Sequence, residues 1–303
     1  MTSKTAGKYR SKKRSEIIAN AIGFLLLVVL AAAVLLPIWW IFRSSLMSNA
    51  SMYSYPPQFF PDQWNFSNYA ATLETYDFLR YLKNSFIIIV PSVLGGVATA
   101  TLAAYAFARL RFRGKKLMFM LCVGSMLLPG TVTMIPLYLM WTNILHLNGT
   151  FLPLILPYFC GGGAFNIFLI RQFISAIPRE LDEAATIDGA NRMQILFRIL
   201  LPAIRPALIV VGLFIFIAIW NDLLQQTLYI SEPENYTIAI GLSMFKSSLK
   251  VDWTKIMCAT CLSFLPGIII YLIGQRYFVE GVVMTGMKRS EEHTSELQSR
   301  RRI

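Results

Sequence analysis

Six long apolar runs constrain what this chain can fold into. A helix needs about 20 mostly apolar residues to cross a lipid bilayer. We place runs of roughly that length at 17–42, 84–108, 117–140, 151–174, 204–224 and 255–279. Hydrophobic residues make up 55% of the chain and charged residues 15%, which departs from the composition of a soluble domain. The sequence therefore predicts an all-α integral membrane protein with six transmembrane helices.

The distribution of Lys and Arg orients these helices. If the N-terminus lies inside the cell, 22 of the 28 Lys and Arg residues fall in inner segments and 6 in outer ones. Cytoplasmic loops carry such an excess, so we predict that both termini are cytoplasmic. The net charge of +12 follows from this topology. We predict no binding of nucleic acid, since no soluble domain with a basic and aromatic face is present.

The first apolar run is predicted to be an uncleaved span. It is far longer than the 7–15 residue apolar region of a signal peptide and has no clear cleavage site. The outer loop that follows, residues 43–83, is rich in aromatic residues. These suit either an interfacial cap over the helix ends or a contact surface for an external protein.

A polar segment with a helical pattern separates the fourth and fifth runs. Pro178 suits the first position of a helix, because its missing N–H needs no partner there. Three acidic residues follow in the first turn, where the helix dipole favours negative charge: Glu180, Asp182 and Glu183. Ala184 and Ala185 lack bulk, so we expect this face to lie against the backbone of another protein.

A turn and a second helix follow. Gly189 permits a sharp change of direction. Apolar residues then recur at helical spacing over 193–201, and Pro202 and Pro206 mark the end. The segment is predicted to be a helix-turn-helix at the membrane surface, shaped to dock on another protein.

The order of residues in this segment resembles a known motif. Glu-Ala-Ala is followed after three residues by Gly, and after nine more by Ile-x-Leu-Pro, as in the EAA loop of the permease subunits of bacterial ATP-binding-cassette (ABC) importers. The matching positions are Glu183, Ala184, Ala185, Gly189, Ile199, Leu201 and Pro202. Asp188 and Ala190 beside Gly189, and Arg171-Gln172-Phe173 before them, resemble the carbohydrate, maltose-type branch of the binding-protein-dependent transport permeases. The likeness extends over about 15–289.

The resemblance implies a type I ABC importer permease (MetI-like) fold with a cytoplasmic coupling helix. It divides the chain into a basic cytoplasmic N-terminus (1–16), a first transmembrane helix with its outer loop (17–83) and a permease core of five helices (84–289), in which the EAA loop occupies 175–203. Residues 290–303 change abruptly in character and resemble a translated adapter sequence, so we interpret them as a non-native tail.

The resemblance also implies which residues couple this chain to its motor. They are Glu183, Ala184, Ala185, Asp188, Gly189, Ala190, Leu201 and Pro202. A separate ABC ATPase dimer would bind ATP and receive this helix, with Glu183 meeting one of its basic residues. The chain itself has no phosphate-binding Gly-x-x-x-x-Gly-Lys-Ser/Thr motif, so we predict that it binds no cofactor and catalyses no reaction.

Further partners are implied in the same way. A second, homologous permease subunit would complete a heterodimer in the bacterial inner membrane, and an extracytoplasmic solute-binding protein would select the cargo. The resemblance favours a sugar or oligosaccharide as that cargo. Permeases for amino acids, phosphate and peptides share the EAA loop, so another small polar solute is the alternative.

Two interrupted segments, the third span with Pro129, Gly130 and Pro136 and the fourth span with Pro153 and Pro157, are predicted to border the translocation path. The run Gly161-Gly162-Gly163 breaks the fourth span, and broken helices at membrane depth are tolerated where protein or a watery cavity covers the freed backbone. Ordinary kinking at proline is the competing interpretation. Asn221 and Asp222 end the fifth span, where a carboxylate usually faces a cavity or a partner. A small shift of the span would instead place Asp222 in the headgroup layer.

Two other functional classes stay open. A secondary transporter would show internal repeats and ionisable residues near the membrane midplane, and neither is clear. A membrane-embedded enzyme would need a nucleophile, a base or a metal cluster, and the only histidines are His146 and His293. The four cysteines lie in apolar runs, so we predict no disulfide and no metal site.

Overall fold

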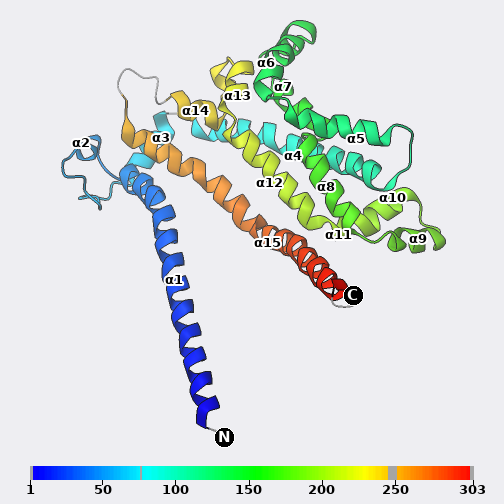
Figure 1. Cartoon of the computed structure of the whole chain (residues 1–303). Coiled ribbons are helices and arrows are strands. Elements are labelled where there is room, and N and C mark those ends of the chain that lie inside the picture. Colours follow the sequence, from blue (N-terminus) through cyan, green and yellow to red (C-terminus); the bar gives the residue numbers. More distant parts are fainter. Residues whose placement is uncertain (1–2, 76, 245–250, 301–303) are drawn as a thin grey trace. The chain divides into compact units, whose positions relative to one another are not determined.

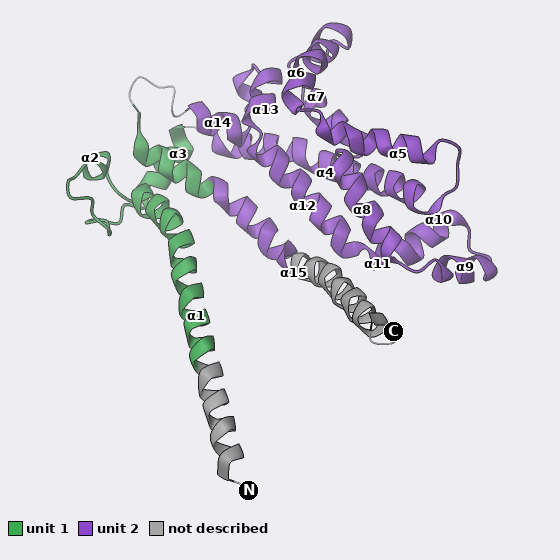
Figure 2. Cartoon of the chain, viewed as in Figure 1, with its two compact units in different colours: residues 1–75, 248–262 green, residues 76–247, 263–303 purple. Residues whose placement is uncertain are grey.

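The computed structural model describes the backbone of residues 3–75, 77–244 and 251–300, and the side chains of 18–75, 77–244 and 251–276. All regular elements in these ranges are helices. The chain divides into two compact units, residues 1–75 with 248–262 and residues 76–247 with 263–303 (Figure 2). The all-α prediction is therefore confirmed for the described residues.

The order of the helices is shown in Figure 1. Unit one holds α1 (Ser3–Ser45), α2 (Asn49–Met52), α3 (Ser67–Thr75) and the start of α15 (Trp253–Arg300). Unit two holds α4 (Phe78–Arg109), α5 (Lys115–Gly124), α6 (Gly130–Leu139), α7 (Leu152–Ile155), α8 (Ala164–Ala176), α9 (Glu180–Ile187), α10 (Arg192–Gln194), α11 (Leu201–Ala203), α12 (Arg205–Asn221), α13 (Leu223–Tyr229), α14 (Ile238–Met244) and the rest of α15. Short 3₁₀ or π turns extend several of these helices.

The candidate membrane spans follow the predicted apolar runs. Four helices are long and apolar enough to cross a bilayer: Ile18–Ser45, Phe78–Arg109, Leu152–Ala176 and Trp253–Arg276. Two further pairs pass the same test but are bent, Lys115–Leu127 with Gly130–Ile144 by 100° and Arg192–Ala203 with Arg205–Asn221 by 78°. The described residues thus give six spans when each bent pair counts as one. The second span begins at Phe78, six residues before the predicted start.

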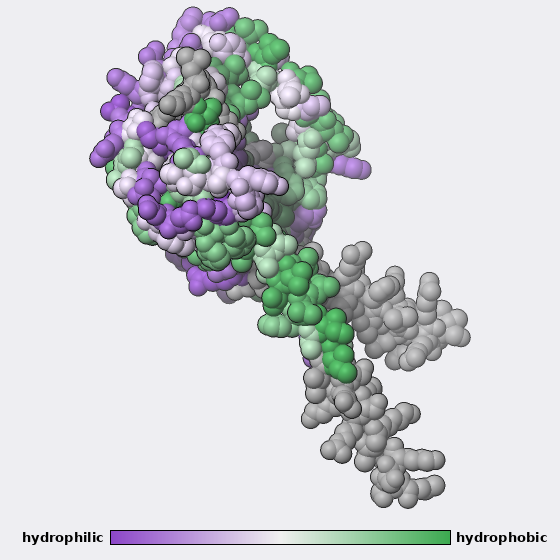
Figure 3. All heavy atoms as spheres, turned by 90° about the vertical axis from the view of Figure 1, so that its left-hand side faces the viewer, coloured by the Kyte–Doolittle hydropathy of each residue, from purple (hydrophilic) through white to green (hydrophobic). Residues whose placement is uncertain are grey.

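Unit one is organised around the end of α1. Ser45 lies 2.7 Å from the hydroxyl of Tyr69, and the Sγ atom of Cys258 donates to the Ser45 carbonyl at 3.2 Å. Trp39 packs against Phe60 of the outer loop, with ring centroids 5.6 Å apart. By contrast, residues 18–38 of α1 are all exposed and present a mostly apolar surface (Figure 3). Such a surface requires lipid or another protein around it.

The core of unit two is built on α4. This helix packs against α8 and α12, and small side chains on one face allow the approach. Ala100 and Ala104 are fully buried there. A Cβ atom on Gly96 would lie 2.7 Å from Cδ1 of Ile215 in α12, so the two helices approach closely at this point.

The glycine run breaks the fourth span where it crosses α4. Gly161, Gly162 and Gly163 have φ angles of 94°, 59° and 106°, which L side chains rarely adopt. Thr99 of α4 accepts a hydrogen bond from the Gly161 N–H at 3.0 Å. A Cβ atom on Gly162 would lie 3.3 Å from Cα of Gly96. The break therefore has a structural cause. The backbone takes positive φ angles at three consecutive residues and touches the backbone of α4.

The far end of α4 is anchored by elements that were not predicted. The apolar runs predicted at 204–224 and 255–279 left residues 225–254 as a connection without predicted structure, yet α13 and α14 fold back onto unit two. Asn84 donates to the carbonyls of Glu234 and Tyr236 at 2.9 and 3.0 Å, and Ser85 accepts from the Ile238 N–H at 3.0 Å. These bonds fix residues 234–238 to the first turns of α4.

Replacing Gly161 with alanine tests the origin of the break. A Cβ atom there would lie 2.7 Å from Cδ1 of Ile167, on a residue with positive φ. Strain and overpacking together should lower the free energy of unfolding by on the order of 2–4 kcal/mol, measured by thermal unfolding in detergent. Gly130→Ala is the control, since no atom lies within 4 Å of its added Cβ. Equal stability of the two variants would contradict the packing account.

Candidate functional site

The candidate site is the helix-turn-helix between α8 and α12. Its first helix, α9, begins at Glu180, two residues later than Pro178 had suggested. The Arg179 carbonyl accepts hydrogen bonds from the N–H groups of Asp182 and Glu183 at 3.0 and 3.1 Å. Three acidic residues occupy the first turn, as the helix dipole favours. In Figure 1, α9 lies outside the bundle that α4, α8 and α12 form.

Hydrogen bonds at the end of α9 and at the start of the next helix fix the turn between them. Gly189 has a φ of 84°, and its N–H donates to the Thr186 carbonyl at 3.1 Å while that of Ala190 reaches the Ala185 carbonyl at 2.9 Å. This pair of bonds is the Schellman termination of a helix. The next helix opens with a reciprocal capping box between Asn191 and Gln194. The direction of the chain is thus fixed within a few residues.

The second helix anchors the site in the core. Residues 192–203 form one helical piece whose middle, Ile195–Leu200, is a π-helix. Leu196 and Leu200 are almost fully buried. The piece ends at Ile204, where it meets α12 at an angle of 78°. Leu201 is half-buried and Pro202 exposed at this bend.

The C-terminal end of α4 holds both helices of the site in place. Nε of Arg109 lies 2.8 Å from Oδ2 of Asp182, and its Nη2 donates to the Ile177 carbonyl at 2.8 Å. Both partners are largely shielded, with side chains 6% and 19% exposed. The Tyr105 hydroxyl donates to the Arg192 carbonyl at 3.2 Å. Two residues one helical turn apart on α4 therefore contact α9 and α10.

The ion pair is a positioning contact more than a source of stability. The second carboxylate oxygen of Asp182, Oδ1, is buried and has no hydrogen-bond partner among the described residues. A buried ion pair with incomplete hydrogen bonding recovers little beyond its desolvation cost, but removing one partner leaves a buried charge uncompensated. The pair therefore penalises any placement of α9 that separates Asp182 from Arg109.

The outward face of α9 combines the Glu183 carboxylate with apolar side chains. Glu183 and Ala184 are exposed, and Ile187 is 86% exposed. Asp188 and Gly189 are also exposed, and Ala190 is half-buried. Ala185, in contrast, is only 9% exposed and packs into this chain's own core. Of the two alanines expected to face another protein, only Ala184 is therefore exposed.

The two candidates for the translocation path have local structural roles. Gly161–Gly163 make the break described above, where the Asn166 side chain also donates to the Gly162 carbonyl at 2.5 Å. Asp222 caps α13, because its Oδ1 accepts from the Gln225 N–H at 3.0 Å. The Asn221 side chain bonds the Ile217 carbonyl of its own helix at 2.9 Å. A path function for these residues stays a prediction.

The geometry describes an exposed helix face that is held from behind by an ion pair. Among the described residues, no group of three or more His, Cys, Asp and Glu side chains is placed to hold a metal ion. Sequence reasoning missed Tyr105, Arg109 and Asp182, since Arg109 counted only as one of the Lys and Arg residues of the inner segments and Asp182 as one acid of a first turn. Nothing in a single sequence pairs them across the intervening residues.

Comparison with known proteins agrees with this architecture. Residues 81–283 match the profile of the family described as the binding-protein-dependent transport system inner membrane component. A probable ABC transporter permease of Pyrococcus horikoshii is 34% identical over 73% of this chain and 83% of its own length. The permease of a diacetylchitobiose uptake system of Streptomyces coelicolor is 30% identical over 86% of this chain and 94% of its own.

A solved structure extends the likeness to the fold. One chain of a bacterial ABC transporter involved in the import of the acidic polysaccharide alginate is 27% identical, with a TM-score of 0.77 over 88% of this chain and 98% of that chain. The family profile covers more than half of the sequence and includes the whole helix-turn-helix. This chain therefore belongs to the family of inner-membrane components of binding-protein-dependent transport systems.

Proposed function

We propose that this chain is the permease subunit of an ATP-driven importer and that α9 receives the force of a separate ABC ATPase dimer. The observation that carries the proposal is an exposed helix face, Glu183 with Ala184 and Ile187, on a helix held rigidly from behind by Arg109. A partner that grips this face moves α4 through the ion pair and α12 through the bend at Ile204. This is a lever acting through contiguous contacts.

The assembly that we propose has four kinds of subunit. An ATPase dimer binds ATP, so this chain needs no cofactor of its own. A second, homologous permease completes a heterodimer and covers apolar surface such as that of α1. An extracytoplasmic solute-binding protein delivers the cargo. Both termini lie in the cytoplasm of a bacterial cell, as the excess of Lys and Arg in the inner segments supports.

We propose a sugar or oligosaccharide as the cargo. Two proteins similar to this chain over most of their lengths are a diacetylchitobiose permease and a subunit of an alginate importer. Both carry carbohydrates by their descriptions.

Uptake of labelled solutes tests the cargo. Cells that express the whole transporter should accumulate labelled di- or oligosaccharide, and cells lacking this chain should not, because the permease forms half of the path. Labelled amino acids and phosphate serve as the comparison. Uptake of an amino acid or phosphate, with no carbohydrate dependent on this chain, would contradict the cargo while leaving the permease function intact.

Charge reversal at Glu183 tests the docking surface. Glu183→Lys should lower transport to a few per cent of wild type, because a lysine would repel the basic residue proposed on the ATPase, while insertion into the membrane stays normal. Transport and ATP hydrolysis are measured in proteoliposomes. Glu232→Lys, the same change on an exposed glutamate after α13, is the control and should retain wild-type rates. A wild-type transport rate in Glu183→Lys would overturn the assignment.

Removal of Asp182's charge tests the anchor behind α9. Asp182→Asn leaves Arg109 buried without its counter-charge, which should cost about 3 kcal/mol of stability and lower the transport achieved per ATP hydrolysed. Asp77→Asn is a matched control, since Asp77 pairs with Arg80 at 3.0 Å but both side chains are half exposed. The control should change stability by less than about 0.5 kcal/mol. Unchanged coupling in Asp182→Asn would argue against the lever.

A further inference from the structure

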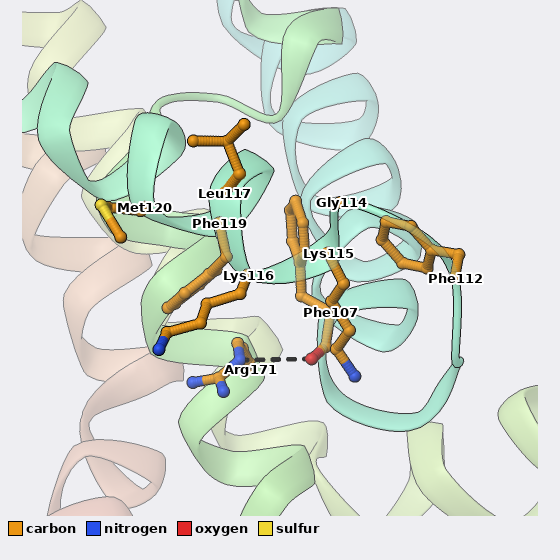
Figure 4. Close-up of a pocket in the computed structure, with 9 residues that line it drawn as sticks. All are labelled: Phe107, Phe112, Gly114, Lys115, Lys116, Leu117, Phe119, Met120 and Arg171. Atoms are coloured by element: carbon orange, nitrogen blue, oxygen red, sulfur yellow. Dashed lines mark hydrogen bonds between the residues drawn. The ribbon is translucent and has the colours of Figure 1, made fainter.

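A cavity of about 810 Å³ in unit two has no role in the coupling described above. It lies between the end of α4, the start of α5 and the middle of α8 (Figure 4). Its volume falls in the range of sites that hold small molecules. Two kinds of side chain line it, and they are separated in space.

The first kind is apolar. Three phenylalanine rings, Phe107, Phe112 and Phe119, line the cavity together with Leu117 and Met120. Leu117 and Met120 are each 59% exposed, so the apolar wall is open to the surroundings. Both lie on α5, within the candidate span that begins at Lys115. The wall therefore faces the depth at which acyl chains lie in a bilayer.

The second kind is cationic. Lys115, Lys116 and Arg171 line the cavity, and none of the lining residues is acidic. Arg111 and Arg179 lie close enough to Lys115 to act on its charge. The first turn of α5 also contains no acidic residue, and the N-terminus of a helix favours an anion. The described residues around the cavity thus form a concentration of positive charge without a counter-ion.

Arg171 is held ready for a ligand. Its Nε donates to the Phe107 carbonyl at 3.3 Å, and its guanidinium carbon lies 4.1 Å from the centre of the Phe119 ring. The bond engages Nε, and no described residue bonds the two Nη groups. Lys116 is exposed, and the Lys115 amine donates to the Leu110 carbonyl at 2.8 Å. The hydrogen bond to Phe107 and the contact with the Phe119 ring therefore fix the orientation of the Arg171 guanidinium without a ligand.

The arrangement of the two kinds of side chain matches an amphipathic anion. In Figure 4 the charged ends of Lys115, Lys116 and Arg171 gather at the lower side of the cavity, while Leu117 and Met120 lie above them. A phosphate bound by the cations would place an attached acyl chain along the phenylalanine rings. Basic pockets where membrane helices meet water suit anionic headgroups for this reason.

We propose that this cavity binds one anionic phospholipid, such as phosphatidylglycerol, from the leaflet at the α5 N-terminus. The phosphate lies between Lys116, Arg171 and the first turn of α5, and the acyl chain lies against Phe112, Phe119 and Met120. The lipid covers the apolar wall and neutralises the charge that the chain leaves uncompensated. The inference requires only that α5 enters the membrane at Lys115, and it is independent of the cargo and of the ATPase.

Photo-crosslinking with lipids tests the proposal directly. The full-length protein in nanodiscs is given phosphatidylglycerol or phosphatidylcholine with the same diazirine-bearing acyl chain, and labelled peptides are mapped by mass spectrometry. Phosphatidylglycerol should label residues 107–120 at least tenfold more than phosphatidylcholine. Equal labelling of residues 107–120 by both lipids, or a preference for phosphatidylglycerol found only outside these residues, would overturn the proposal.

Charge-matched variants separate the site from general attraction. Lys116→Gln with Arg171→Gln should lower the labelling by phosphatidylglycerol roughly tenfold or more, given the attraction of each cation near a membrane surface. Lys83→Gln with Arg198→Gln removes the same charge at exposed positions that do not line the cavity and should leave labelling unchanged. If the first pair fails to fold, Lys116→Gln alone alters an exposed residue and should lower labelling about fivefold. An equal loss in the control pair would contradict the site.

Discussion

The contact between Arg109 and Asp182 ties the candidate site to the membrane-spanning part of unit two. A carboxylate in the first turn of a surface helix would ordinarily point to water, where its charge costs nothing. Here it is drawn under α9 and paired at 2.8 Å with an arginine at the end of α4. Because an unpaired charge at this burial is expensive, α9 is restricted to positions that keep the pair intact. The exposed residues of α9 are thereby presented in one orientation.

Helix α4 organises both ends of unit two. At one end, Arg109 and Tyr105 hold the helix-turn-helix, and at the other, Asn84 and Ser85 hold the segment after α13. Between them, Ala100 and Ala104 let α8 and α12 pack closely. A displacement of α9 therefore acts on α4, which contacts its neighbours at both ends and in the middle. A helix that transmits movement through a membrane protein needs such contacts along its length.

The all-α class and the candidate spans could be predicted from the sequence, because long apolar runs are local signals. The turn after α9 could also be predicted, since Gly189 adopts a positive φ without the strain of a side chain. The burial of Ala185 could not be predicted, because either alanine could have faced inward. The packing of α13 and α14 was hidden for a similar reason, since polar residues such as Gln226 are buried there by pairing with backbone and side-chain partners. The Arg109–Asp182 pair depends on how α4 and α9 approach, which no local pattern encodes.

The distance between α9 and α4 in the two nucleotide states is the most direct measurement of the account. Spin labels are placed at Leu181→Cys and Leu102→Cys, both exposed positions outside the face formed by Glu183, Ala184 and Ile187, in the assembled transporter with its four native cysteines replaced. Pulsed electron paramagnetic resonance then gives the distance distribution without nucleotide and with ATP trapped. The account predicts one narrow distribution at the same distance in both states, because α9 and α4 move together. A distance that changes between the states would contradict the rigid connection on which the proposed mechanism depends.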